Sequence, residues 1–184
     1  MTDHRPPIFS LTRSFDAPRE LVFMAHSQAA HLSRWWWAKG FAFAKCTLDF
    51  RPGGNFHYCM RSPDGHEIWG KFAYREIIAP ERIVFTSSFA DETGATVRAP
   101  FSAEWPLEVL NTLTLTEQGG TTAVEMLGSP LNATQAERRS FGAARESVSQ
   151  CLAGTFGQLS EHLAALRSGT MVDEVHHAAL TRTT

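Results

Sequence analysis

Four turn signals at roughly even spacing divide the middle of the chain: Arg51-Pro52-Gly53-Gly54, Ser62-Pro63-Asp64-Gly65, Ala79-Pro80-Glu81 and Gln118-Gly119-Gly120. Between these turns apolar side chains occupy every second position, as at Phe56, Tyr58 and Met60. A period of two between tight turns is typical of antiparallel strands with one buried and one solvated face. The pattern therefore predicts an antiparallel meander of about six strands with one dry face.

The residues before this meander predict one more strand and two short helices. Residues 8–15 favour a strand because their apolar side chains alternate. Asp16 is expected to cap a helix that ends at about Ala25. Ser27 is expected to cap a second short helix that runs to Trp35.

The last predicted element is a long helix from Thr134 to about Leu166. Its apolar residues recur at helical spacing: Phe141, Val148, Leu152, Phe156, Leu159, Leu163 and Leu166. One helical stripe cannot cover a curved sheet of about six strands, so the sheet must wrap around the helix. The expected fold class is α+β, with a core or a cavity between sheet and helix.

The size and charge of the chain limit its domains and partners. A length of 184 residues predicts one domain over 8–166, with a flexible N-terminus over 1–7 and a C-terminal tail over 167–184. The formal net charge is −2, so no basic field exists to hold a phosphate backbone, and nucleic acid is not expected as a partner. Neither a signal peptide nor an apolar run of membrane-spanning length is visible. We expect no membrane insertion and a cytoplasmic location.

The cysteines and the known catalytic motifs give no sign of a metal or a cofactor. Cys46, Cys59 and Cys151 are widely spaced and form no CxxC pair, so we expect reduced thiols and no bound metal. The motifs GxSxG, HExxH, GxGxxG and GxxxxGKS/T are absent, which disfavours an enzyme and predicts no cofactor. A small cyclase or hydrolase stays an alternative, and it would need a polar group such as Tyr58 or Arg13 in a cavity.

Five local motifs, in order along the chain, resemble those of a known family. They are Phe15–Phe23 (FDAPRELVF), His31–Trp36 (HLSRWW), Leu48–Gly54 (LDFRPGG), Pro63–Gly65 (PDG) and Ile77–Thr86 (IIAPERIVFT). Through these motifs, residues from about 8 to 166 resemble the Hsp90 ATPase activator homologue 1-like family of the START-like (SRPBCC) superfamily.

This resemblance implies a helix-grip fold, in which a strongly bent antiparallel sheet of about six to seven strands surrounds a long C-terminal helix. Many members of the superfamily hold an apolar small molecule between sheet and helix. Binding of a small hydrophobic or amphipathic ligand in such a cavity is therefore the leading functional hypothesis. The family name comes from a co-chaperone, so an Hsp90-type chaperone is the alternative partner. Gly154 and Phe156 stand where the family's helix often carries a Gly-Trp pair.

The residues expected to line the space between sheet and helix are mainly apolar: Phe50, Phe56, Tyr58, Met60, Phe72, Phe85, Trp105, Leu113, Met126, Leu152, Phe156 and Leu159. For any one of them, packing in a solid core is the alternative to ligand contact. Methionine is an adaptable filler that suits a promiscuous pocket. Tyr58 is the polar group on this face.

Two aromatic segments have two interpretations each. Trp35 and Trp36 either close the mouth of the cavity or plug the end of the barrel, and at least one residue of the run Trp35-Trp36-Trp37 is expected to be exposed. The stretch from Asp91 to Pro106 breaks the strand rhythm and is either a lid or an insertion packed on the rim. The protein is expected to be a monomer or a homodimer, and a homodimer is favoured if an exposed Trp and this loop form one apolar patch.

Arg13 is a charged residue on the apolar parity of the first strand. A guanidinium that faces the interior needs a partner or an anionic ligand group. We therefore include it among the cavity candidates, with Glu104 as a conceivable partner. The alternative is that the strand bulges or ends there and the side chain reaches water.

Overall fold

The computed structural model describes residues 9–169 and shows a single antiparallel sheet with four helices. The strand order is β1-β8-β7-β5-β4-β3-β2, and the short β6 pairs with β5. The strands are β1 (Phe9–Phe15), β2 (Ala42–Leu48), β3 (Asn55–Arg61), β4 (Glu67–Ile78), β5 (Arg82–Ala90), β6 (Thr96–Val97), β7 (Glu108–Gln118) and β8 (Thr121–Leu131). The helices are α1 (Arg19–Ser27), α2 (Ala29–Trp35), α3 (Gln135–Ala143) and α4 (Arg145–Arg167).

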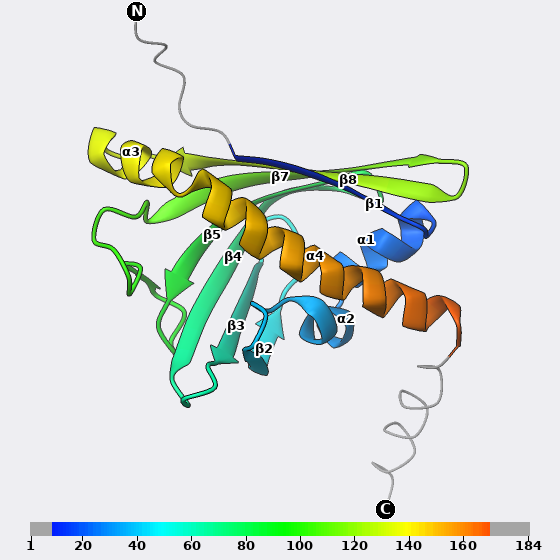
Figure 1. The fold of residues 1–184 in the computed structure, drawn as a ribbon, viewed down its shortest axis with the longest axis horizontal. Helices are drawn as coiled ribbons and strands as arrows, with labels where there is room; N and C mark the ends of the chain where they lie inside the picture. Colours follow the sequence, from blue (N-terminus) through cyan, green and yellow to red (C-terminus); the bar gives the residue numbers. More distant parts are fainter. Residues whose placement is uncertain (1–8, 170–184) are drawn as a thin grey trace, which may run out of the picture.

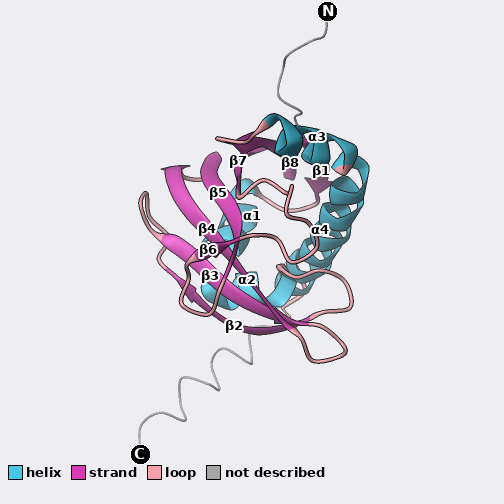
Figure 2. Ribbon diagram, turned by 90° about the vertical axis from the view of Figure 1, so that its left-hand side faces the viewer, coloured by secondary structure: helices cyan, strands magenta, loops and turns pink. Residues whose placement is uncertain are grey.

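The sheet bends around α4, which runs diagonally across its concave side (Figure 1). In the perpendicular view, α4 stands opposite the curved strands β2–β5 (Figure 2). This arrangement confirms the predicted α+β helix-grip fold, with two short helices after β1. Each of the four turn signals joins two neighbouring strands, as expected for a meander.

The alternating pattern of the strands places one face against the helix. On β7, the buried positions are every second residue: Val109, Asn111, Leu113 and Leu115. β1 keeps a continuous register with β8 from Phe9 to Phe15. The predicted flexible N-terminus over 1–7 and most of the predicted C-terminal tail over 167–184 lie outside the described residues. In residues 9–169, no helix is long and apolar enough to cross a membrane.

The predicted single C-terminal helix is wrong in one respect, because it divides into α3 and α4 at Ala144. The apolar stripe has its longest interval here, seven residues between Phe141 and Val148. No large apolar side chain in this interval anchors the helix to the sheet, so packing does not hold the two parts on one axis. α3 begins where predicted, with a capping box between Thr134 and Glu137.

The predicted caps of the first two helices are also wrong. Pro18 takes the N-cap of α1 and Gln28 that of α2, and neither end has a side-chain cap hydrogen bond. Ser27 instead donates its hydroxyl to the Met24 carbonyl. These short helices are held by burial of Val22, Ala25, Leu32 and Trp35 rather than by capping.

Candidate ligand cavity between the sheet and the helix

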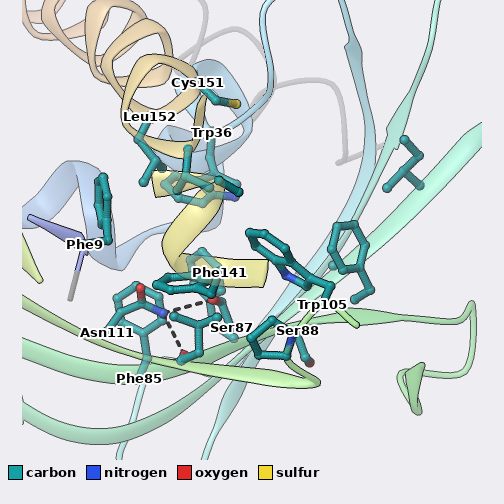
Figure 3. A pocket seen from close by; sticks show the side chains of 18 of the residues that line it. Phe9, Trp36, Phe85, Ser87, Ser88, Trp105, Asn111, Phe141, Cys151 and Leu152 are labelled. Atoms are coloured by element: carbon teal, nitrogen blue, oxygen red, sulfur yellow. Dashed lines mark hydrogen bonds between the residues drawn. The ribbon is translucent and has the colours of Figure 1, made fainter. Parts of the chain in front are cut away.

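A cavity of about 430 Å³ lies between the concave face of the sheet and the α3–α4 segment. Figure 3 shows its walls, with Asn111, Ser87 and Phe85 from the sheet facing Trp36, Leu152 and Cys151 across the space. Its lining comes from β1, β3–β5, β7, β8, the residue after α2, the loop before β7, and the helices: Phe9, Trp36, Tyr58, Met60, Ile68, Trp69, Gly70, Phe72, Phe85, Ser87, Ser88, Phe89, Phe101, Trp105, Pro106, Val109, Asn111, Met126, Phe141, Ala144, Ser147, Val148, Cys151 and Leu152.

Aromatic rings in direct contact build one wall, with Trp36 edge-to-face to Phe72 and Phe85 tilted against Phe72. The ring centroid of Trp36 lies 5.0 Å from that of Phe72, at an interplanar angle of 77°. Phe72 in turn lies 4.4 Å from Phe85 on the neighbouring strand. Aromatic pairs at such spacings are stable beyond their area burial. The wall is therefore an apolar surface of packed aromatic rings.

The helix α4 holds Trp36 in place through the backbone. Trp36 follows the last residue of α2, where helix carbonyls lack intrahelical partners. The Gln158 side chain donates to the carbonyls of Trp35, at 2.9 Å, and Trp37, at 2.8 Å. The Thr155 hydroxyl donates to the same Trp37 carbonyl. Polar groups on α4 thus fix the segment that carries Trp36 into the cavity.

The loop between β6 and β7 forms a second wall. Trp105 packs against Phe141 of α3 with ring centroids 5.4 Å apart, and Phe101 packs against Trp105 at 5.3 Å. The Arg98 guanidinium donates to the Trp105 carbonyl and pairs with Glu137. Because Glu137 also belongs to the capping box of α3, one carboxylate ties the loop to the start of that helix.

Tyr58 brings a hydroxyl to the cavity. It packs over Gly70 of β4, its register partner on the neighbouring strand. Burial raises the pKa of Tyr58, and a hydrogen bond from Trp36 acts in the opposite direction. The hydroxyl therefore keeps its proton at neutral pH.

The other polar groups of the wall are neutral as well. Asn111 donates to the Ser87 hydroxyl and to the Val109 carbonyl, each at 2.9 Å. Among the described residues that line the cavity, none is Asp, Glu, Lys, Arg or His. A buried charge without a partner is strongly unfavourable. The cavity is therefore suited to uncharged molecules.

The structure brings many of the predicted site residues to the cavity. Those that line it are Trp36, Tyr58, Met60, Phe72, Phe85, Trp105, Met126 and Leu152. The rest pack elsewhere. Leu113 and Phe156 are buried core residues beside a separate small void of about 20 Å³. Leu159 and Phe56 are fully buried, and Phe50 lies against Phe23 and Tyr74. Ligand contact by the lining residues stays a prediction.

The tryptophan run divides between the two interpretations. Trp35 is fully buried and donates its indole N–H to the Ala25 carbonyl, so it plugs the end of the core. Trp36 lines the cavity instead. The expectation that one of the three is exposed is wrong, because Trp36 and Trp37 are both half-buried. The chain leaves the helix after Trp35, so the helical spacing assumed for Trp36 and Trp37 no longer applies.

Arg13 neither bulges out to water nor lines the cavity. It stays in register in β1 and donates its guanidinium to the Ala153 carbonyl of α4, 3.1 Å away. The guanidinium passes Gly157 of the same helix, where a Cβ would lie at an ordinary contact distance of 4.0 Å from it. The partner is a backbone carbonyl rather than Glu104. Arg13 therefore joins sheet to helix.

Several lining residues were absent from the prediction. The interior positions of β1 and β7 include Phe9, Val109 and Asn111. The sequence offers one signal for Asn111, because it is a polar residue between the apolar interior positions Val109 and Leu113. Phe101 lies on the loop whose two interpretations were left open. Ser147 and Cys151 are exposed residues of α4 at the mouth, where no apolar periodicity points.

No metal centre accompanies the cavity in residues 9–169, where no three His, Cys, Asp or Glu side chains are grouped to hold an ion. The three cysteines are free, with Cys59 buried and Cys151 exposed. His31 Nδ1 and His162 Nε2 lie 3.0 Å apart at the contact between α2 and α4. Neither histidine is among the residues that line the cavity.

The sequence model of the family described as "Activator of Hsp90 ATPase homolog 1-like protein" matches residues 16–164. No curated protein is significantly similar in sequence. A solution structure of a protein from Arthrobacter aurescens is 25% identical, with a TM-score of 0.72, and the match covers 89% of this chain and 90% of that one.

Two crystal structures are similar at lower identity. A protein from Nitrosomonas europaea is 19% identical, with a TM-score of 0.71, over 90% of this chain and 99% of that one. The AHSA1 protein from Silicibacter pomeroyi is 17% identical, with a TM-score of 0.63, over 85% of this chain and 97% of that one. These similarities support the fold and leave the ligand open.

Proposed function

The chain belongs to the Hsp90 ATPase activator homologue 1-like family, and we propose that it binds a small, mostly apolar molecule between the bent sheet and α4. The single observation that carries the proposal is the cavity of about 430 Å³. This volume falls within the range of small-molecule sites, about 300–1,000 Å³. A solid core would leave no such space, since protein interiors are close-packed.

The cavity also has a route for a ligand to enter. Phe101, Ser147 and Cys151 are exposed to solvent and belong to its lining. These residues come from the loop before β7 and from α4, so the mouth lies between loop and helix. An apolar interior with an exposed rim and a few neutral polar groups is typical of ligand pockets.

Native mass spectrometry of gently purified protein, with denaturing extraction of the same sample, tests the proposal. A bound mass of a few hundred daltons is expected. Binding is then measured by titration with N-phenyl-1-naphthylamine, an uncharged apolar dye whose fluorescence rises in a dry site. We expect saturable binding with one dye per chain.

Two matched variants test whether the dye binds in this cavity. Ser147→Phe adds a ring at the mouth and is expected to weaken dye binding about tenfold, an effect of about 1.4 kcal/mol. Gln150→Phe adds the same ring at an exposed position of the same helix outside the lining, and the affinity should not change. Equal affinities in both variants, or no saturable binding to the wild type, would contradict a ligand site in this cavity.

An Hsp90-type chaperone partner is a second proposal. The family description and the exposed apolar side chains Val97, Phe101 and Leu107 favour it. The test is the ATPase rate of the cognate chaperone at saturating protein, where an unchanged rate ends this proposal. Catalysis in the cavity, a cytoplasmic location and the oligomeric state stay predictions.

A further inference from the structure

Asn111 is an unusual residue for the wall of an apolar cavity. It lies on the interior parity of β7, between Val109 and Leu113, and only 3% of it is exposed. It lines the cavity together with Ser87 of the adjacent strand β5 (Figure 3). A buried amide is costly unless its donors and acceptor find partners.

The hydrogen bonds fix which way the amide points. The Val109 carbonyl can only accept, so the nitrogen of Asn111 must face it, at 2.9 Å. The second amide proton goes to the Ser87 hydroxyl, also at 2.9 Å. Both donors are then used. The remaining polar atom, Oδ1, accepts no hydrogen bond from residues 9–169.

Gly128 keeps the surroundings of this oxygen open. It is the register partner of Asn111 on β8, and a Cβ at this position would lie 3.1 Å from Oδ1. Such a contact is tighter than most Cβ atoms accept, so a side chain at 128 would crowd the oxygen. The oxygen keeps some accessible surface, since it is absent from the fully buried atoms that lack a partner. We assign this accessible surface to the cavity, because Asn111 belongs to its lining.

From these observations we infer the chemical class of the ligand. It is an uncharged, flat aromatic molecule that carries a hydroxyl or N–H group and donates it to Oδ1 of Asn111. The aromatic walls suit a flat ring, and the lining has no charged residue to pair with an ion. This inference rests on the proposed function and adds the polar contact that orients the ligand.

Three probes of one size separate the features of the inferred ligand: 2-naphthol, which donates a hydrogen bond, 2-methoxynaphthalene, which cannot donate, and 2-naphthoate, which is charged. Affinities are measured by displacement of N-phenyl-1-naphthylamine. We expect 2-naphthol to bind about tenfold more tightly than 2-methoxynaphthalene, as one net hydrogen bond permits. The affinity for 2-naphthoate should be the weakest of the three.

Asn111→Leu tests the residue, because leucine has a similar volume and no acceptor. The variant should bind 2-naphthol and 2-methoxynaphthalene equally, and its unchanged affinity for 2-methoxynaphthalene shows that the cavity is intact. Gly128→Ala is the second variant if the first fails to fold. It keeps Asn111 but crowds Oδ1, so it should reduce the tenfold preference.

The outcomes separate the inference from the proposed function. Equal binding of 2-naphthol and 2-methoxynaphthalene by the wild type would overturn the role of Asn111 and leave a ligand site in place. So would a preference that survives in both variants. Failure of every probe and of the dye to bind would overturn the proposed function itself. A preference that is lost in Asn111→Leu supports both.

Discussion

Single glycine residues leave room for neighbouring side chains in the cavity wall. At Gly70, a Cβ would lie 2.4 Å from both the Cζ and the hydroxyl oxygen of Tyr58. Glycine at this position therefore lets the tyrosine ring lie flat across β4. In this position Tyr58 lines the cavity together with Gly70.

The first prediction concerns this glycine. Gly70→Ala forces the Tyr58 ring to move and should lower the free energy of unfolding by about 1–3 kcal/mol, the usual effect of overpacking. The measurement is chemical denaturation of variant and wild type.

Gly154→Ala is the matched control for Gly70→Ala. This glycine lies in the interior of α4, and a Cβ there meets nothing within 4 Å. The variant should gain up to about 1 kcal/mol, because alanine has the higher helix propensity. Equal effects of the two substitutions would contradict the proposed contact between Gly70 and Tyr58.

At the scale of elements, side chains of α4 organise segments far away in sequence. Gln158 binds the carbonyls that follow α2, and Arg13 of β1 binds the carbonyl of Ala153. Each contact joins a segment near the start of the chain to the last helix. The helix α4 thus holds the fold together through hydrogen bonds to other segments as well as through its apolar stripe.

The second prediction concerns the joint at Gln158. Gln158→Leu keeps the volume but leaves the Trp35 and Trp37 carbonyls without this donor, which should cost about 2 kcal/mol or more of stability. Because Trp36 lies between these carbonyls and lines the cavity, the affinity for the neutral dye should fall as well. Gln150→Leu, at an exposed position of the same helix, is the control and should change neither quantity.

The loop from 91 to 106 shares features of both interpretations. Its Trp105 packs against Phe141 and lines the cavity, whereas 63% of Phe101 is exposed. Arg98 joins the loop to Glu137, and this guanidinium holds the pKa of the Glu137 carboxyl below its usual range. The loop is therefore held to α3 by an ion pair as well as by the apolar contacts of Trp105.

The third prediction concerns that pair. Arg98→Gln removes the charge and should raise the rate of limited proteolysis within 91–106 about fivefold, as expected for a loss of about 1 kcal/mol of local stability. Arg61→Gln breaks the exposed pair with Glu67, where β3 ends and β4 begins, and is the control. Cleavage that is equally fast in both variants would show that Arg98 does not hold the loop.

At the scale of the whole molecule, two buried histidines connect stability to pH. Burial lowers the pKa of His26 to about 4, and the Val22 carbonyl that accepts from its Nδ1 acts in the opposite direction. Burial also lowers the pKa of His162 to about 4, with smaller contributions from His31 and Arg34. In the unfolded chain both side chains take up a proton near pH 6.5.

The fourth prediction follows from this difference. Between pH 6.5 and 4 the unfolded state binds more protons than the folded state, so the free energy of unfolding falls as the pH falls. The slope is up to about 1.4 kcal/mol per pH unit for each histidine. Above pH 6.5 both states are neutral at these side chains, and this contribution has no pH dependence.

The measurement is chemical denaturation from pH 7.5 to 5.0, a range above the ordinary titration of carboxylates. His162→Gln should reduce the slope below pH 6.5 by up to about 1.4 kcal/mol per pH unit. His66→Gln, at an exposed position in the turn between β3 and β4, is the control. An unaltered slope in His162→Gln would refute the contribution assigned to this residue.

The sequence by itself determined the elements that depend on neighbouring residues. The turns at Gly53, Gly65 and Gly119 have positive φ angles, which glycine accepts without strain. The period-two segments between them became strands, and the apolar stripe from Phe141 to Leu166 became the gripped helical segment. Periodicity and turn chemistry are local properties, so one sequence suffices to predict them.

The tertiary structure alone decided which apolar residues enclose a space and which fill the core. Leu113 and Met126 are register partners with the same pattern, yet only Met126 lines the cavity. The unpaired oxygen of Asn111 and the hydrogen bonds of Gln158 to the carbonyls after α2 depend on contacts between segments that are far apart in the chain. Alternation states that a side chain faces inward, whereas the curvature of the sheet and the path of α4 decide what it meets there.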